Sequence, residues 1–207
     1  MYIKKESAML ASLILGFGLA FSLTAYIVYF KAVTHSSITP NRWSWLVWSI
    51  ATGAEALTYN ALNEGELQTI IFGVGAVSTA LITIRIWSKS TWVTPSVSET
   101  LTVVACVLSL ALWLAFQLTW WAHMLVVLAV PVAFYPTWKD AWHAPQNESW
   151  VPWTLWSVGD GLAVLLTVMH TNHPLDELPY AIVEFLSHLA VVLIVVLRKR
   201  CERGSSS

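Results

Sequence analysis

The sequence has 207 residues, of which 57% are hydrophobic and only 11% are charged, and its formal net charge is −1. A soluble domain of this size carries about 25% charged residues, so this composition predicts a chain that lies in lipid. The near-neutral charge leaves no basic surface and gives no reason to expect a nucleic-acid partner. The two cysteines, Cys106 and Cys201, do not form a disulfide framework.

Seven stretches of the chain have the roughly 20 mostly apolar residues that a membrane-crossing helix needs. They cover residues 8–31, 43–63, 67–87, 98–116, 120–138, 150–170 and 178–198. The first is longer than the apolar part of a signal peptide, so we expect it to be retained. Turn-forming residues separate most stretches, at Pro40-Asn41, Asn63-Glu64-Gly65-Glu66, Pro95, Pro145-Gln146-Asn147 and Thr171-Asn172-His173-Pro174. No such residue separates the fourth stretch from the fifth. Because backbone groups in lipid must be paired within the segment, the predicted fold is all-α.

Lysine and arginine predict the orientation, because loops on the cytoplasmic side carry more of both. The loops after the first, third and fifth stretches and the C-terminus hold Lys31, Arg42, Arg85, Lys89, Lys139, Arg198, Lys199, Arg200 and Arg203. The opposite side holds only Lys4 and Lys5. We therefore expect a multi-pass protein of the inner (plasma) membrane with its N-terminus outside and its C-terminus in the cytoplasm.

Six residues recur at an offset of 108, and both copies fit the pattern K-x3-H-x9-W-x2-W-S-x3-G. The first copy is Lys31, His35, Trp45, Trp48, Ser49 and Gly53, and the second is Lys139, His143, Trp153, Trp156, Ser157 and Gly161. The offset maps the first three helices onto the last three and leaves the fourth as a linker. That linker gives both triplets the same direction through the membrane, as in parallel repeats. The predicted units are 1–90 and 118–200 as triple-helix bundles, 91–117 as the linker helix and 201–207 as a cytoplasmic tail.

This three-plus-one-plus-three plan resembles the PQ-loop superfamily, which includes SWEET sugar transporters, cystinosin-type lysosomal carriers and the KDEL receptor. The segments Thr39–Ser49 (TPNRWSWLVWS) and Pro136–Ser149 (PTWKDAWHAPQNES) are most similar to a bacterial PQ-loop-like branch. The superfamily has a Pro-Gln pair near the cytoplasmic end of the first helix of each triplet. Val28-Tyr29 and Pro136-Thr137 stand at those places, and Pro145-Gln146 lies in the following loop. The resemblance therefore implies a proline hinge only in the second half.

Three carboxylates, Glu55, Asp160 and Glu184, fall inside the predicted helices. Each costs about 2.5–3.5 kcal/mol at the bilayer centre, so each is by default a functional hypothesis. At about 1.5 Å per residue, all three lie roughly 9–15 Å below the outer surface. They predict one shared cavity between the halves, bordered by the second, sixth and seventh helices.

Glu184 and His188 are four residues apart, so they share a helix face and can exchange a proton. The alternative is a buried pair that only fastens the seventh helix to its neighbours. Asp160 lies between two glycines, which allow a close approach of another helix or of a substrate.

The duplicated tryptophans lie near the predicted cytoplasmic boundary, where anchoring in the membrane interface is their expected role. Trp48 and Trp156 lie deeper and are the better candidates for a cavity wall. Asn60, near the outer end of the second helix, suits a mouth rather than a central site. Asp140 and Glu148 are placed to pair locally with the nearby Lys139 and His143.

His170, His173 and Asp176 form only a loose metal-ligand pattern, and we expect no metal or other cofactor. The sequence contains no nucleophile, phosphate-binding or metalloprotease motif, so an enzyme is not expected. We expect a transporter of a small polar solute, with proton coupling left open, for which a monomer is sufficient and lipid is the solvent. The alternatives are a receptor with a ligand pocket but no flux, and a structural partner whose acids are all paired internally.

Overall fold

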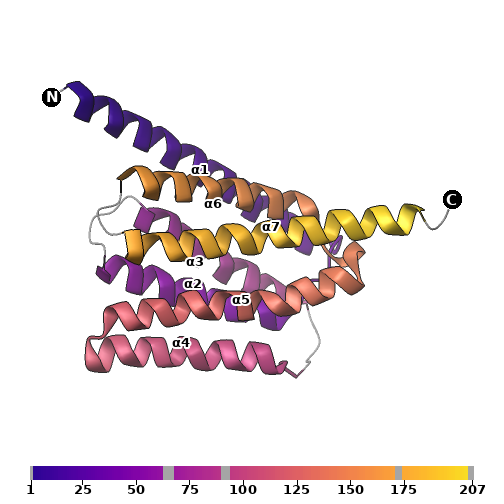
Figure 1. Cartoon of the computed structure of the whole chain (residues 1–207). Helices are drawn as coiled ribbons and strands as arrows, with labels where there is room; N and C mark the ends of the chain where they lie inside the picture. Colours follow the sequence, from indigo (N-terminus) through magenta and orange to yellow (C-terminus); the bar gives the residue numbers. More distant parts are fainter. Residues whose placement is uncertain (1, 63–67, 90–93, 171–173, 205–207) are drawn as a thin grey trace.

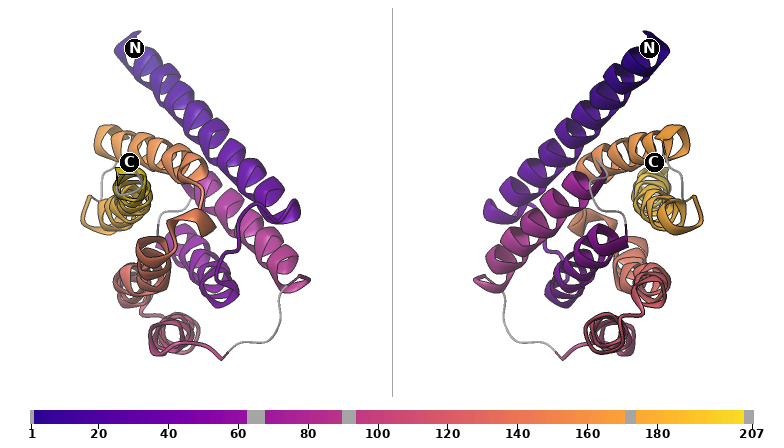
Figure 2. Two further views of the ribbon diagram at one scale, coloured as in Figure 1. Left: turned by 90° about the vertical axis from the view of Figure 1, so that its right-hand side faces the viewer. Right: turned by 90° about the vertical axis from the view of Figure 1, so that its left-hand side faces the viewer.

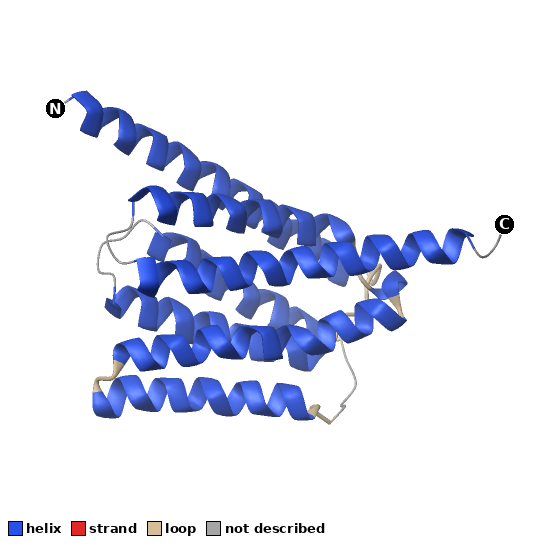
Figure 3. Cartoon of the chain, in the orientation of Figure 1, coloured by secondary structure: helices blue, strands red, loops and turns tan. Residues whose placement is uncertain are grey.

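Seven α-helices dominate the computed structural model, which describes residues 2–62, 68–89, 94–170 and 174–204 (Figures 1 and 3). They are α1 (Tyr2–Thr34), α2 (Arg42–Leu62), α3 (Gln68–Trp87), α4 (Val97–Phe116), α5 (Thr119–His143), α6 (Trp150–His170) and α7 (Pro174–Gly204), with a short 3₁₀ turn, η1 (Pro145–Asn147), before α6. No strand occurs among these residues. The all-α prediction is therefore confirmed. The predicted turns at 63–66 and 171–173 lie outside the described residues.

Six of these helices, all except α2, are long and apolar enough to cross a membrane, so the chain has the character of a multi-pass membrane protein. The sequence analysis expected a seventh span over α2. This helix carries two ionisable residues, Arg42 and Glu55, and both are buried. It packs against α3, α4 and α5, so protein rather than lipid covers much of its surface. A helix in that position can carry polar residues, because protein groups rather than lipid surround them.

Helix α4 lies on the outside of the bundle, as the end-on views show (Figure 2). Helix α3 packs against α1 and α2, and α7 packs against α5 and α6. In addition, α1 lies along α6 and α2 lies along α5, while α4 covers α5 and α2. The N-terminal part of α1 projects away from the other helices, and the two chain ends lie at opposite ends of the molecule (Figure 1).

The boundary between α4 and α5, which lacked a breaker in the sequence, is formed by a tight helix end. Gln117 adopts the left-handed conformation (φ 57°), and its amide donates to the Trp113 carbonyl oxygen. The Leu118 amide donates to the Leu112 carbonyl oxygen, which completes a Schellman-type end. At its other end α4 begins with a capping box in which Ser96 and Glu99 each bind the other's backbone amide.

Hydroxyl groups join α2 to α3. Ser49 and Thr83 share a hydrogen bond of 2.8 Å between α2 and α3, and Thr52 and Thr79 share one of 2.9 Å. Such side chains commonly link helices in membranes, where few other polar partners exist.

Helices α1 and α6 approach closely at Gly159, and this contact generates a stability prediction. A Cβ atom at Gly159 would lie 2.6 Å from Ser22 Oγ and 3.3 Å from the Gly18 carbonyl oxygen. We expect Gly159→Ala to separate the two helices and to lower the free energy of unfolding by about 1–3 kcal/mol. Thermal unfolding in detergent measures this change.

Gly53→Ala is the matched control, because a Cβ atom at Gly53 meets nothing within 4 Å. Here the better helix propensity of alanine predicts unchanged or slightly higher stability, by at most about 1 kcal/mol. Equal melting temperatures for both variants would show that the α1–α6 contact is not tight.

Candidate functional site

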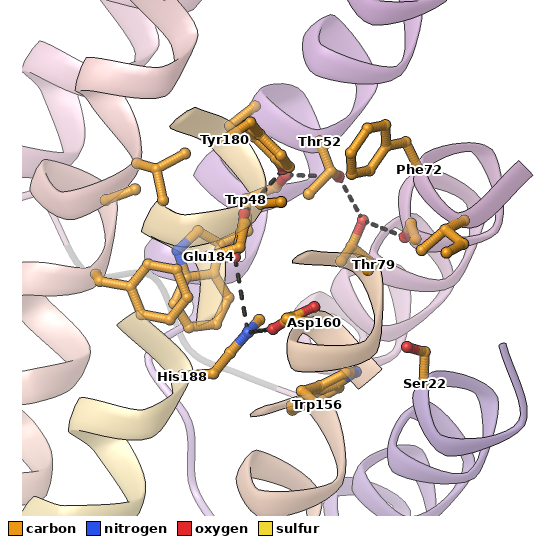
Figure 4. A pocket seen from close by; sticks show the side chains of 18 of the residues that line it. Ser22, Trp48, Thr52, Phe72, Thr79, Trp156, Asp160, Tyr180, Glu184 and His188 are labelled. Atoms are coloured by element: carbon orange, nitrogen blue, oxygen red, sulfur yellow. Dashed lines mark hydrogen bonds and ion pairs between the residues drawn. The ribbon is translucent and has the colours of Figure 1, made fainter. Parts of the chain in front are cut away.

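A cavity of about 80 Å³ lies between the helices (Figure 4). Every helix except α4 contributes to its wall. The volume suffices for a few water molecules or a small group. The cavity therefore depends on how six helices pack together.

Asp160, Glu184 and His188 form an acid–histidine cluster on the cavity wall (Figure 4). His188 Nδ1 lies 2.6 Å from Asp160 Oδ2, which joins α7 to α6, and 3.7 Å from Glu184 Oε2. The Tyr180 hydroxyl donates a 2.8 Å hydrogen bond to the other oxygen of Glu184. The side chains of the cluster are 14–18% exposed, so they are shielded but reachable.

The charges of this cavity do not balance within the protein. Two carboxylates face one imidazole, and no lysine or arginine of the described chain lines the cavity. With His188 protonated, the cluster still has a net charge of −1. One more positive charge, from a proton or a ligand, is needed to make it neutral.

Aromatic side chains form the cavity end next to the cluster. Trp45, Trp48, Trp153 and Trp156 are all buried and all line the cavity. The expected anchoring at the membrane interface is therefore wrong for Trp45 and Trp153, whereas Trp48 and Trp156 line the cavity as predicted. The four pack against one another and against α1 and α5, because the α2 and α6 faces that carry them turn inward. The exposed tryptophans, which include Trp121, Trp142 and Trp150, are at other places in the sequence.

Two of the four buried indoles have an unused hydrogen-bond donor. Trp45 Nε1 donates to the Tyr29 hydroxyl at 3.2 Å, and Trp153 Nε1 donates to Glu148 at 3.0 Å. The Nε1 atoms of Trp48 and Trp156 are buried and have no hydrogen-bond partner. Buried donors are nearly always satisfied, so two unpaired donors in residues that line the cavity favour a water or ligand oxygen as their partner.

Glu55, which the sequence analysis placed in the same cavity, lies in a separate buried pair. Its Oε2 atom is 3.1 Å from His123 Nδ1 on α5, and both side chains are 0% exposed. The two do not line the cavity, to which α2 contributes Trp45, Trp48, Ala51 and Thr52. Helix rotation explains the difference, since the face of α2 that carries Glu55 packs against α5.

The remaining predicted site residues are not brought together. Asn60 is exposed on α2 and does not line the cavity. Among the described residues no three His, Cys, Asp or Glu side chains are arranged to hold a metal ion. The loose ligand pattern of His170, His173 and Asp176 lies outside the side chains that the structure describes.

Sequence reasoning found the acids and His188 but missed two other partners of the acids, His123 and Tyr180. His123 and Tyr180 occupy apolar helices, and polar residues at such places are functional candidates by the rule that singled out Glu55. Tyr26, whose ring lies 5.0 Å from that of Trp156, carried no comparable signal. Its position on the cavity wall depends on how α1 crosses α6.

Another buried carboxylate, Glu148, is hydrogen-bonded to Trp153, which also lines the cavity. It follows η1, and its oxygens accept hydrogen bonds from the Tyr29 hydroxyl at 3.1 Å and Trp153 Nε1 at 3.0 Å. Lys199 binds its backbone oxygen at 2.9 Å. The local pairing with Lys139 or His143 expected from the sequence is therefore replaced by contacts that join α1, α6 and α7.

The fold and composition define an all-helical, multi-pass membrane protein with an acidic cavity between its helices. Comparison of the chain with protein-family models, curated proteins and solved structures gives no significant match. No particular family is thus identified.

The water accessibility of the cavity is testable with a cysteine at Thr52. In a Cys201→Ser background the remaining Cys106 is buried, so a new thiol dominates labelling. We expect Thr52→Cys to react with 2-aminoethyl methanethiosulfonate at least about tenfold faster than Ala54→Cys, because only an accessible thiol forms the reactive thiolate. Ala54 is the control, since it is buried on the same helix and does not line the cavity. Equal rates would contradict an accessible cavity.

The raised pKa of the Glu148 carboxyl group predicts that the free energy of unfolding depends on pH. Burial raises its pKa from 4.5 to about 7, against the opposing effect of the hydrogen bonds from Trp153 and Tyr29. The folded protein therefore holds this proton more tightly than the unfolded chain, so its contribution is greatest below pH 4.5 and is lost as the pH rises through 7. Relative to Glu148→Gln, which keeps an acceptor and no charge, the wild type should lose up to about 3 kcal/mol over this range. Thermal unfolding at several pH values measures the difference, and parallel profiles would contradict it.

Proposed function

We propose that the protein transports a small polar solute across the membrane by alternating access between two related helix bundles. The observation that carries the proposal is the acid–histidine cluster, which borders a cavity between the helices. Ionisable groups within membrane helices are expensive and mark solute or ion pathways. Binding sites of transporters with internal repeats likewise lie at the interface of the repeats.

The packing supports two related halves, residues 1–90 and 118–200, joined by the linker helix at 91–117. Under the offset of 108, α1, α2 and α3 correspond to α5, α6 and α7. In each set the third helix packs against the other two, and the α1–α6 contact corresponds to the α5–α2 contact. Ring contacts follow the same rule: Tyr26 lies 5.0 Å from Trp156, and their counterparts Phe134 and Trp48 lie 4.8 Å apart.

One aromatic pair supports an axis that passes through the cavity. Phe72 and Tyr180 are separated by 108 residues, and their ring centroids lie 5.0 Å apart. A residue contacts its own counterpart only close to the axis that relates two repeats. Both residues line the cavity, so the solute site is proposed to lie on this axis.

The two halves supply different chemistry to this site. The counterparts of Asp160, Glu184 and His188 are Thr52, Ala76 and Ala80. All the charge of the cavity therefore belongs to the second half, whereas the first half contributes hydroxyl groups from α2 and α3. We propose that the second half binds the coupling proton, and that the solute bridges both halves.

The same arrangement supports the proposed orientation and span number. The chain ends lie at opposite ends of the molecule, which favours an odd number of crossings with α2 as the seventh (Figure 1). The excess of lysine and arginine near the C-terminal end favours a cytoplasmic location for that end. Helix α5 contains Pro131 and Pro136, where missing backbone hydrogen bonds allow it to bend. We propose that bending of α5 accompanies the exchange of access, as in PQ-loop proteins.

A structural partner without transport would pair all its acids internally. Glu55 fits that description, since His123 covers it, but Asp160 and Glu184 border the cavity. A receptor with a one-sided pocket remains the alternative, and solute flux distinguishes it from a transporter.

Uptake into proteoliposomes tests the proposal. A panel of radiolabelled amines, amino acids, sugars and nucleosides is offered with and without a pH gradient, and at least one should accumulate faster than in protein-free vesicles. Asp160→Asn should reduce the gradient-driven rate at least about a hundredfold, because its partner His188 loses a charged contact and the cavity loses one exchangeable proton. Asp140→Asn is the matched control, because Asp140 is exposed and outside the cavity. Absence of flux for every solute would reject the transporter.

A further inference from the structure

From the charge and donor pattern of the cavity, and resting on the proposed transport function, we infer the substrate class: a small organic monocation, an amine with one oxygen acceptor such as an amino alcohol, which exchanges for one proton. Three independent features of the cavity wall point to it. They are the charge of the acid–histidine cluster, the two unpaired indole donors, and the size and aromatic character of the walls.

The charge of the acid–histidine cluster determines whether a cation or an anion is favoured as the ligand. With Asp160 and Glu184 ionised and His188 protonated, one negative charge is left over in a site shielded from water. A net charge in such surroundings is costly unless it is paired. An anion would add to the imbalance, and a zwitterion or a neutral solute would leave it unchanged. A monocation removes it.

The unpaired indole N–H donors favour a ligand that has a hydrogen-bond acceptor. Trp48 and Trp156 each present a buried Nε1–H without a hydrogen-bond partner, and both residues line the cavity. A hydroxyl oxygen can accept from an indole, whereas an ammonium group has no lone pair to offer. A ligand with both groups satisfies the carboxylates at one end and an indole at the other.

The walls favour the same class. Tyr26, Phe72 and Phe134 line the cavity together with the tryptophans. The faces of aromatic rings attract cations and repel anions. At about 80 Å³ the cavity suits a ligand of a few heavy atoms. A larger solute would require the surrounding helices to move apart.

Proton exchange follows from the charge balance. The cluster is neutral either with one carboxyl group protonated or with the ligand cation bound, but not with both. When the amine binds, the proton leaves a carboxyl oxygen of Asp160 or Glu184 for water, and when the amine departs a proton returns. One proton therefore moves against each cation, and the membrane carries no net charge in the cycle.

The titratable groups around the cluster are few. Tyr26 faces it from α1, and Tyr180 on α7 donates to Glu184. The next ionisable groups are Glu55 on α2 and His123 on α5, which form their own pair. Among the described residues, α3 contributes no ionisable side chain to the cavity wall. The exchange therefore involves the cluster itself.

Ethanolamine is the probe for the test, with the full-length protein in proteoliposomes that are acidic inside. We expect the pH gradient to drive ethanolamine uptake above the leak of protein-free vesicles, with one lumenal proton lost per ethanolamine as reported by a trapped pH dye. Propylamine, which has the charge but no oxygen, should compete about tenfold more weakly, the worth of one hydrogen bond. Ethylene glycol and glycine, which lack a net charge, should not compete.

The indole donors are tested by Trp48→Phe and Trp156→Phe, which keep an aromatic ring and remove the N–H. We expect each substitution to lower the affinity for ethanolamine to that for propylamine. The affinity for propylamine itself should change less than about twofold. Trp138→Phe is the control, because Trp138 lies outside the cavity and donates its N–H to the Ser187 carbonyl oxygen. An unchanged preference for ethanolamine in both cavity variants would overturn the role of the donors.

The outcomes separate the two proposals. Uptake of a neutral or zwitterionic solute without uptake of amines would overturn the inference and leave the transporter intact. Amine uptake without proton loss from the lumen would overturn the exchange. Absence of flux for every solute would remove the transporter and the inference together.

Discussion

The constraint on which this structure depends is the cost of charge inside a membrane. Asp160, Glu184, His188, Glu55 and His123 all lie within long apolar helices, and each meets an oppositely charged or hydrogen-bonding partner on another part of the fold. The 2.6 Å contact between His188 and Asp160 ties α7 to α6, and the Glu55–His123 pair ties α2 to α5. Breaking either pair would leave a charge without compensation, so the arrangement of the helices and the pairing of the charges stabilise one another.

The two acid–histidine pairs differ in one respect that bears on function. Glu55 and His123 are fully enclosed and lie 3.1 Å apart, with one acid for one histidine. The other cluster has two acids for one histidine and borders a cavity, so it has capacity for one more positive charge. A structural role explains the first pair well. The second is better explained by a ligand or proton that comes and goes, and the proposed transport cycle follows from that difference.

The buried tryptophans connect this cavity to the buried carboxylate of Glu148. They contact the cavity on one side, while Tyr29 and Trp153 bind the buried Glu148 on the other. The hydrogen-bonding partners of these tryptophans differ. Trp45 and Trp153 have partners within the protein, and Trp48 and Trp156 have none. The aromatic wall of the cavity thus includes two residues whose donors are unused.

The amino-acid sequence by itself determined that the chain is helical and multi-pass, because hydropathy over 20 residues depends on composition alone. It also singled out Asp160, Glu184 and His188, since ionisable residues in apolar helices are rare enough to stand out. Tertiary structure decided which of these residues meet. The rotation of α2 directs Glu55 toward His123 and leaves Thr52 on the cavity wall. The tryptophans that the sequence suggested for the membrane interface are buried, because they lie on the inward faces of α2 and α6. The physical reason is that hydropathy determines whether a helix is stable in the membrane, whereas the direction in which each side chain points depends on contacts with helices that are distant in sequence.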